Sequence, residues 1–145
     1  MKDFLRALSE RLLELFGREY RLFYGRVWQG AKGTCFFVLP SKVKREVLPG
    51  GRIRREYSLS LRFYPAKREE LILQQQVGEK LLPELVELSG KKRRYHGRDL
   101  VYQPGEEFLT VSGTYEFYTT AEQEREESVV AAGDLMLEFD LNKLM

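Results

Sequence analysis

Apolar residues recur every three or four positions in two parts of the chain, and this period is typical of amphipathic helices. The first part covers residues 5–16, and Gly17 stands where such a helix would end. The second part precedes Pro83. Because a proline disfavours helical dihedral angles in the residue before it, we expect this helix to end at Leu81 or Leu82.

Five other segments show the patterns that are typical of β-strands. Residues 55–65 alternate almost without error, and the apolar side of this predicted strand consists of Tyr57, Leu59, Leu61 and Phe63. Residues 35–39 are apolar throughout, which predicts a central strand buried on both faces. The remaining predicted strands are 19–28, 99–103 and 108–119.

Turn residues connect these predicted strands. A glycine-bearing turn is expected at 29–33, and Pro49-Gly50-Gly51 predicts a hairpin with a long basic tip. Pro104-Gly105 predicts a second hairpin. Residues 85–88 fit either a last helical turn or a short extended piece.

The order of elements predicts an α+β domain. We expect a mostly antiparallel sheet, with an N-terminal helix and a central helix packed on one face. The single domain would span residues 1–119, which fits a chain of 145 residues. Residues 120–145 would form a C-terminal tail, acidic and then apolar, that docks on the same domain or on a neighbouring subunit. The second sheet face would meet water or another subunit.

Composition argues against several kinds of chemistry. The 24 basic and 22 acidic residues give a net charge of +2, so no overall field attracts nucleic acid or an anionic membrane. One histidine, His96, and one cysteine, Cys35, form neither a disulfide framework nor an ordinary zinc site. Ser112 lacks the preceding glycine of a nucleophile elbow. We therefore expect no catalytic, cofactor or metal site.

The N-terminal residues are charged, and the longest apolar run is too short to cross a bilayer. We therefore expect neither a secretion signal nor a membrane anchor.

Charged side chains gather in three segments whose pattern indicates binding. The predicted subunit-interface residues are basic in the hairpin, Lys42, Lys44, Arg45, Arg52, Arg54 and Arg55, and acidic in the tail, Glu122, Glu124, Glu126 and Glu127. A third group, predicted to face a partner or DNA, is Lys91, Lys92, Arg93 and Arg94. The basic groups fit acidic segments of neighbouring subunits, or phosphates with Tyr95 and Tyr102 stacking on bases. The small net charge favours subunit contact.

Five short segments together form a recognisable pattern: 22–24 through Val27, the turn 29–30, the run 35–38, the strand end 62–65, and the hairpin from 99–102 to Phe108. In their order and spacing they resemble the tail terminator proteins of tailed bacteriophages and of prophages in Gram-positive bacteria. The resemblance covers residues 4–119.

This resemblance implies a small, non-enzymatic α+β structural protein that assembles as a homo-oligomeric ring, usually a hexamer. The ring would cap the tail tube and join it to the head. Its partners would be copies of itself, the tail tube protein and the head connector protein, with DNA only as passing cargo and no membrane. The protein would lie in the bacterial host cytoplasm during assembly and then in a virion tail or tail-like particle. The alternative is a small nucleic-acid-binding module that uses the basic hairpin and residues 91–94.

Overall fold

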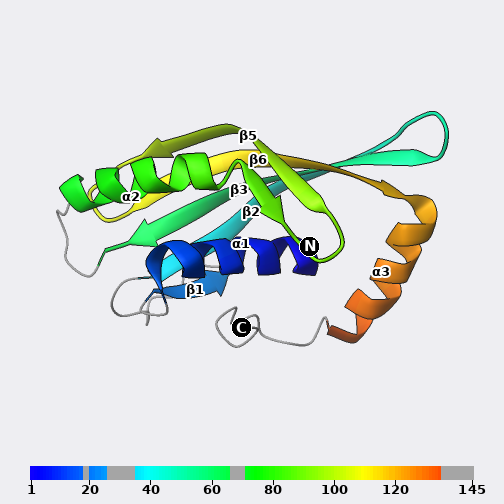
Figure 1. Cartoon of the computed structure of the whole chain (residues 1–145), viewed down its shortest axis with the longest axis horizontal. Coiled ribbons are helices and arrows are strands. Elements are labelled where there is room, and N and C mark those ends of the chain that lie inside the picture. The colour runs from blue at the N-terminus through cyan, green and yellow to red at the C-terminus, as the bar shows by residue number, and fades with distance from the viewer. Residues whose placement is uncertain (18–19, 26–34, 66–70, 135–145) are drawn as a thin grey trace.

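The computed structural model describes residues 1–17, 20–25, 35–65 and 71–134, with side chains described as far as residue 127. Within these residues, three helices and six strands follow one another along the chain (Figure 1). They are α1 (Lys2–Phe16), β1 (Arg21–Tyr24), β2 (Cys35–Val47), β3 (Arg52–Tyr64), α2 (Leu71–Glu84), β4 (Glu87–Ser89), β5 (Arg94–Gln103), β6 (Leu109–Thr120) and α3 (Ala121–Asp134).

The six described strands form one curled, mixed sheet that resembles half of a barrel. Its strand order is β1-β2-β3-β6-β5-β4. Only the β1–β2 pair is parallel, so the expected mostly antiparallel pairing is confirmed, as are the β2–β3 and β5–β6 hairpins. The register shifts between Pro40 and Lys42 and between Arg98 and Val101, and such irregularities bend a sheet.

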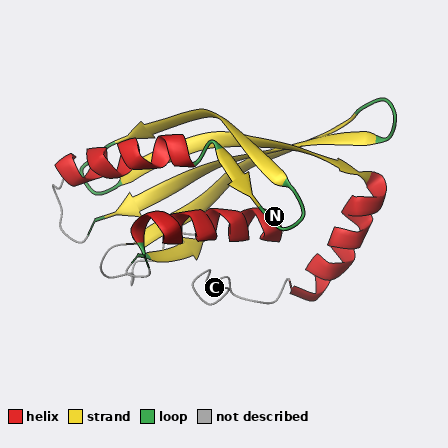
Figure 2. Ribbon diagram, in the orientation of Figure 1, coloured by secondary structure: helices red, strands yellow, loops and turns green. Residues whose placement is uncertain are grey.

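The prediction that the N-terminal and central helices pack on one face of the sheet is wrong. Figure 2 shows the three helices in separate places: α1 in the middle of the molecule, α2 beside one end of the sheet and α3 beyond the other end. Helix α1 packs against the curled sheet, where the Phe4 ring contacts those of Tyr57, Tyr95 and Tyr115. A curled sheet offers no single flat surface on which the helices could form one layer.

The alternating pattern of residues 55–65 is confirmed, because Tyr57, Leu59, Leu61 and Phe63 are all buried in the core. Residues 35–38 are also buried, as expected of a strand covered on both faces. Phe36 belongs to the core cluster, whereas Phe37 lies against the rings of Phe23 and Tyr64. This strand is an inner strand of the sheet, between β1 and β3.

Helix α1 ends as expected, because Gly17 adopts a positive φ of 80° and donates its N–H to the Leu13 carbonyl. Helix α2 continues two residues past Leu82 to Glu84, with Pro83 inside its last turn. A proline this close to the end removes only one helical hydrogen bond, and the Leu85 N–H still reaches the Leu81 carbonyl at 3.0 Å.

Strand β5 begins at Arg94, five residues earlier than expected, because residues 87–89 form the short strand β4 and pair with it. His96 therefore lies in a strand, opposite Glu87. The start of the predicted tail forms α3, whereas residues 135–145 lie outside the described residues. So do the expected turn at 29–33 and the outer parts of the first predicted strand.

Candidate functional site

The β2–β3 hairpin extends well past the core (Figure 1). Every residue of β2 from Pro40 to Val47 is exposed. The turn needs backbone conformations that glycine adopts easily, since Gly50 and Gly51 have φ angles of 85° and 79°. The hairpin is therefore a projecting two-stranded arm, and its six basic residues are divided between the two faces of the sheet.

Arg45 and Arg55 lie on the concave face, directly opposite each other on β2 and β3. Two like charges in this position repel each other. Glu124, in the first turn of α3, lies 3.0 Å from the Nε of Arg45 and 3.3 Å from the Nη1 of Arg55. Burial alone would raise the pKa of Glu124, but these two arginines and a hydrogen bond from Thr119 lower it overall. Glu124 thus compensates two cations and holds α3 on the hairpin.

A second ion pair joins α3 to the body of the molecule. The guanidinium of Arg93 donates to the carboxylate of Glu127 and lies 5.2 Å from the centre of the Phe117 ring. The acidic tail and the basic hairpin, predicted to be complementary, therefore meet within one chain. No pattern in the sequence pairs Arg93 with the tail, because residues 91–94 are far from it along the chain.

A cavity of about 510 Å³ lies between the start of α1, the hairpin, the β4–β5 turn and α3. Asp3 braces this turn by accepting hydrogen bonds from the backbone N–H groups of Lys91 and Lys92 and from the Tyr95 hydroxyl. Burial and then this hydrogen bond raise the pKa of Tyr95. The turn is thereby fixed with the Lys91 and Lys92 side chains exposed. Asp3 was missed in the sequence, where it resembles an ordinary acidic residue in a first helical turn.

The opposite, convex face carries a second charged network. Glu56 and Glu116 lie opposite each other on β3 and β6, and Arg54 binds both, at 2.7 Å and 3.1 Å. Arg98 also binds Glu56, at 2.7 Å. A hydrogen bond from Tyr118 lowers the pKa of Glu116 despite partial burial, and Arg54 adds to the effect. The arginines thus allow Glu56 to remain only 8% exposed.

The remaining predicted residues lie at the surface. Lys42, Lys44, Arg52, Arg94, Glu122 and Glu126 are exposed. Arg52 lies over the Tyr118 ring, 4.6 Å from its centre. In the nucleic-acid alternative, Tyr95 was expected to stack on bases, but its ring is only 1% exposed. Tyr102, the other residue expected to stack, is half-buried, and its hydroxyl donates a hydrogen bond to Glu79.

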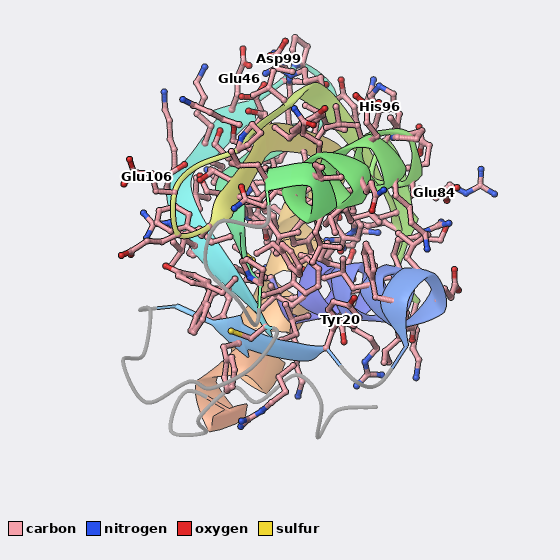
Figure 3. All side chains as sticks on the ribbon, turned by 90° about the vertical axis from the view of Figure 1, so that its left-hand side faces the viewer. Tyr20, Glu46, Glu84, His96, Asp99 and Glu106 are labelled. Atoms are coloured by element: carbon pink, nitrogen blue, oxygen red, sulfur yellow. The ribbon has the colours of Figure 1, made fainter. Side chains whose placement is uncertain are left out.

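The side chains considered for catalysis, Cys35, Ser112 and His96, do not come together in one site. Cys35 is buried, and burial raises the pKa of its thiol, whereas a nucleophile needs a lowered one. Ser112 lies within β6, opposite Ser60. Figure 3 shows His96 at the outside of the ribbon, with Glu46 and Asp99 also at the periphery. Among the described residues, no group of three or more His, Cys, Asp or Glu side chains could hold a metal ion.

Within the described part of the chain, no helix combines the length and apolar character needed to cross a membrane.

A small curled sheet with a projecting charged arm fits the class of structural assembly proteins. Residues 3–127 match the family described as "Phage tail terminator protein", which covers most of the chain. The chain belongs to this family, as the resemblance implied, and it is therefore a structural protein of a phage tail. No curated protein matches the chain in sequence.

Proposed function

We propose that the protein assembles head-to-tail into a ring, a hexamer, that caps the tail tube and joins it to the head connector. The observation that carries this proposal is the family match over residues 3–127. Assembly would take place in the host cytoplasm, with DNA passing through the finished ring and with no catalytic step.

The hairpin from Lys42 to Arg55 forms one half of the proposed interface, and the acidic C-terminal part of the next copy forms the other half. Lys42, Lys44 and Arg52 remain exposed on the hairpin, while Glu122 and Glu126 remain exposed on α3. A head-to-tail contact needs two different, complementary surfaces on each copy. Like charges on the hairpin disfavour a two-fold contact with another hairpin.

The pairs that Glu124 and Glu127 make within the chain have a supporting role in this proposal. By holding α3 against the hairpin, they set the direction in which the exposed charges of α3 point. The arginines that are already neutralised within one chain, Arg45 and Arg55, are then less important for contact between copies than the exposed lysines.

Charge reversal of the exposed hairpin residues tests the interface. The variant Lys42→Glu, Lys44→Glu, Arg52→Glu should keep a native circular dichroism spectrum and lose the ring in light scattering. The control, Gln75→Glu with Gln76→Glu, adds negative charge at exposed positions of α2 and should keep the ring.

A compensating change sharpens this test. Glu122→Lys with Glu126→Lys, added to the triple variant, should partly restore assembly. Because exposed ion pairs are screened by salt, the effect should weaken as ionic strength rises. Rings that persist in the triple variant at low salt would remove the hairpin charges from the interface.

A further inference from the structure

The outer edge of β2 is open over most of its length. β1 pairs with β2 only from Cys35 to Val38, whereas β3 pairs with its other side as far as Val47. Among the described residues, no strand pairs with the outer side of residues 40–47, and all eight are exposed. At about 3.4 Å per residue, this edge is roughly 27 Å long. Its unpaired N–H and C=O groups are a template for another strand.

The two faces of this open edge differ in chemistry. Val43 and Val47 lie on the concave side, and these apolar side chains are 53% and 66% exposed. Arg45 lies between them on the same side, where it pairs with Glu124. Lys42 and Lys44 lie on the convex side. Edge lysines discourage pairing with a second copy of the same strand. A complementary strand would instead be apolar on one face and acidic on the other.

The chain contains one segment with this pattern. Residues 135–141 read Leu-Met-Leu-Glu-Phe-Asp-Leu, and the last five alternate between apolar and acidic. Such alternation is typical of a strand with one apolar and one polar face. The segment lies outside the described residues and after the family match, which ends at residue 127.

We propose that residues 135–141 of one copy add as an antiparallel strand to the open β2 edge of the neighbouring copy. This inference rests on the proposed ring and names the segment that completes its interface. It is a case of strand addition, in which backbone hydrogen bonds supply affinity and alternate side chains supply specificity. In the register that pairs both acidic residues with lysines, Leu135 faces Val47, Glu138 faces Lys44, Phe139 faces Val43 and Asp140 faces Lys42. The same register places Met136 opposite Glu46 and Leu137 opposite Arg45.

The direction of α3 favours the neighbouring copy over the same chain. The helix starts at the far end of the hairpin, where Thr120 pairs with Arg52. Glu124 still contacts Arg45 of β2, but the following ion pair of the helix, Glu127 with Arg93, is beside the start of β5, which β3 and β6 separate from β2. The helix thus leads the chain away from its own β2 edge, and an edge and a tail on different copies suit a head-to-tail assembly.

Engineered disulfides test the contact in the full-length chain. In a Cys35→Ala background, Val43→Cys and Phe139→Cys would lie within the range of a disulfide if the two strands pair in this register. Under oxidation, a non-reducing gel should then show a series of covalent oligomers larger than a dimer. Because position 43 is exposed, its substitution leaves the core intact.

The matched control moves the first cysteine to the opposite half of the sheet. Val101 on β5 is 56% exposed, similar to Val43, which makes the two positions comparable. Because β5 is not next to β2, Val101→Cys with Phe139→Cys should give no series of covalent oligomers. Each single-cysteine variant can give at most a dimer, so larger products require both cysteines. The series should disappear on reduction.

Two results would overturn the inference: a cross-link within one chain, or no cross-link of the 43/139 pair. Light scattering of the reduced protein separates this failure from that of the proposed function. A ring without the covalent series leaves the ring standing and rejects strand addition. A covalent series without a closed ring supports strand addition and rejects the capping ring.

Discussion

Glu124 is the residue on which the docking of α3 depends most, and Glu124→Gln removes its charge with little change of shape. The carboxylate compensates both Arg45 and Arg55, which lie opposite each other. Each partly exposed ion pair is worth about 0.2–1 kcal/mol. In the variant, the repulsion between Arg45 and Arg55 is no longer compensated. Together, these effects should lower the free energy of docking of α3 by about 1–2 kcal/mol, which raises the equilibrium constant for local opening of the helix roughly 5- to 30-fold.

Amide hydrogen exchange of α3, followed by mass spectrometry, measures this opening directly. The matched control is Glu126→Gln, which removes the same charge from an exposed position on the same helix. Faster exchange in α3 is expected only for Glu124→Gln, with unchanged protection in β3 and β6. Equal exchange in the two variants would refute the role assigned to Glu124.

Three further predictions concern the stability of the domain. Leu61→Ala should lower the free energy of unfolding by about 2–5 kcal/mol in urea titrations, since Leu61 is buried in the core; an unchanged midpoint would show that the β3 register is wrong. Gln74→Ala should cost about 1–3 kcal/mol by removing two hydrogen bonds to the β5–β6 turn, while Gln75→Ala at an exposed position should be neutral. The lowered pKa values of Glu116 and Glu124 imply a thermal midpoint that is constant above their ordinary value of 4.5 and falls as the pH drops below it; a midpoint that rises on acidification would contradict this.

The parts of the fold that could be predicted are those set by local periodicity. The apolar stripe of α1 and the alternation of β3 are visible in the sequence because each element buries one side against a single core. The two hairpins could also be predicted, from the order of the strands and the turn residues between them. The curl of the sheet could not be predicted, because it depends on register shifts between strands that are distant along the chain.

The candidate site could be predicted only in part, for the same reason. The basic hairpin and the acidic tail stand out by composition, and their attraction was expected. That Glu124 meets Arg45 and Arg55 of its own chain depends on where β6 ends relative to the hairpin, and the β3–β6 register sets this position. The bracing of residues 91 and 92 by Asp3 joins segments almost ninety residues apart, and no local pattern indicates it.

The mass of the purified full-length chain in solution tests the central claim most directly. Light scattering over a range of protein concentrations, with electron microscopy of the same samples, should show a closed ring of six copies of the 17.1 kDa chain, about 103 kDa in total. The ring should form more readily at low salt than at high salt. A single 17.1 kDa species at every concentration and ionic strength would contradict the proposal that this tail protein acts as a self-assembled ring.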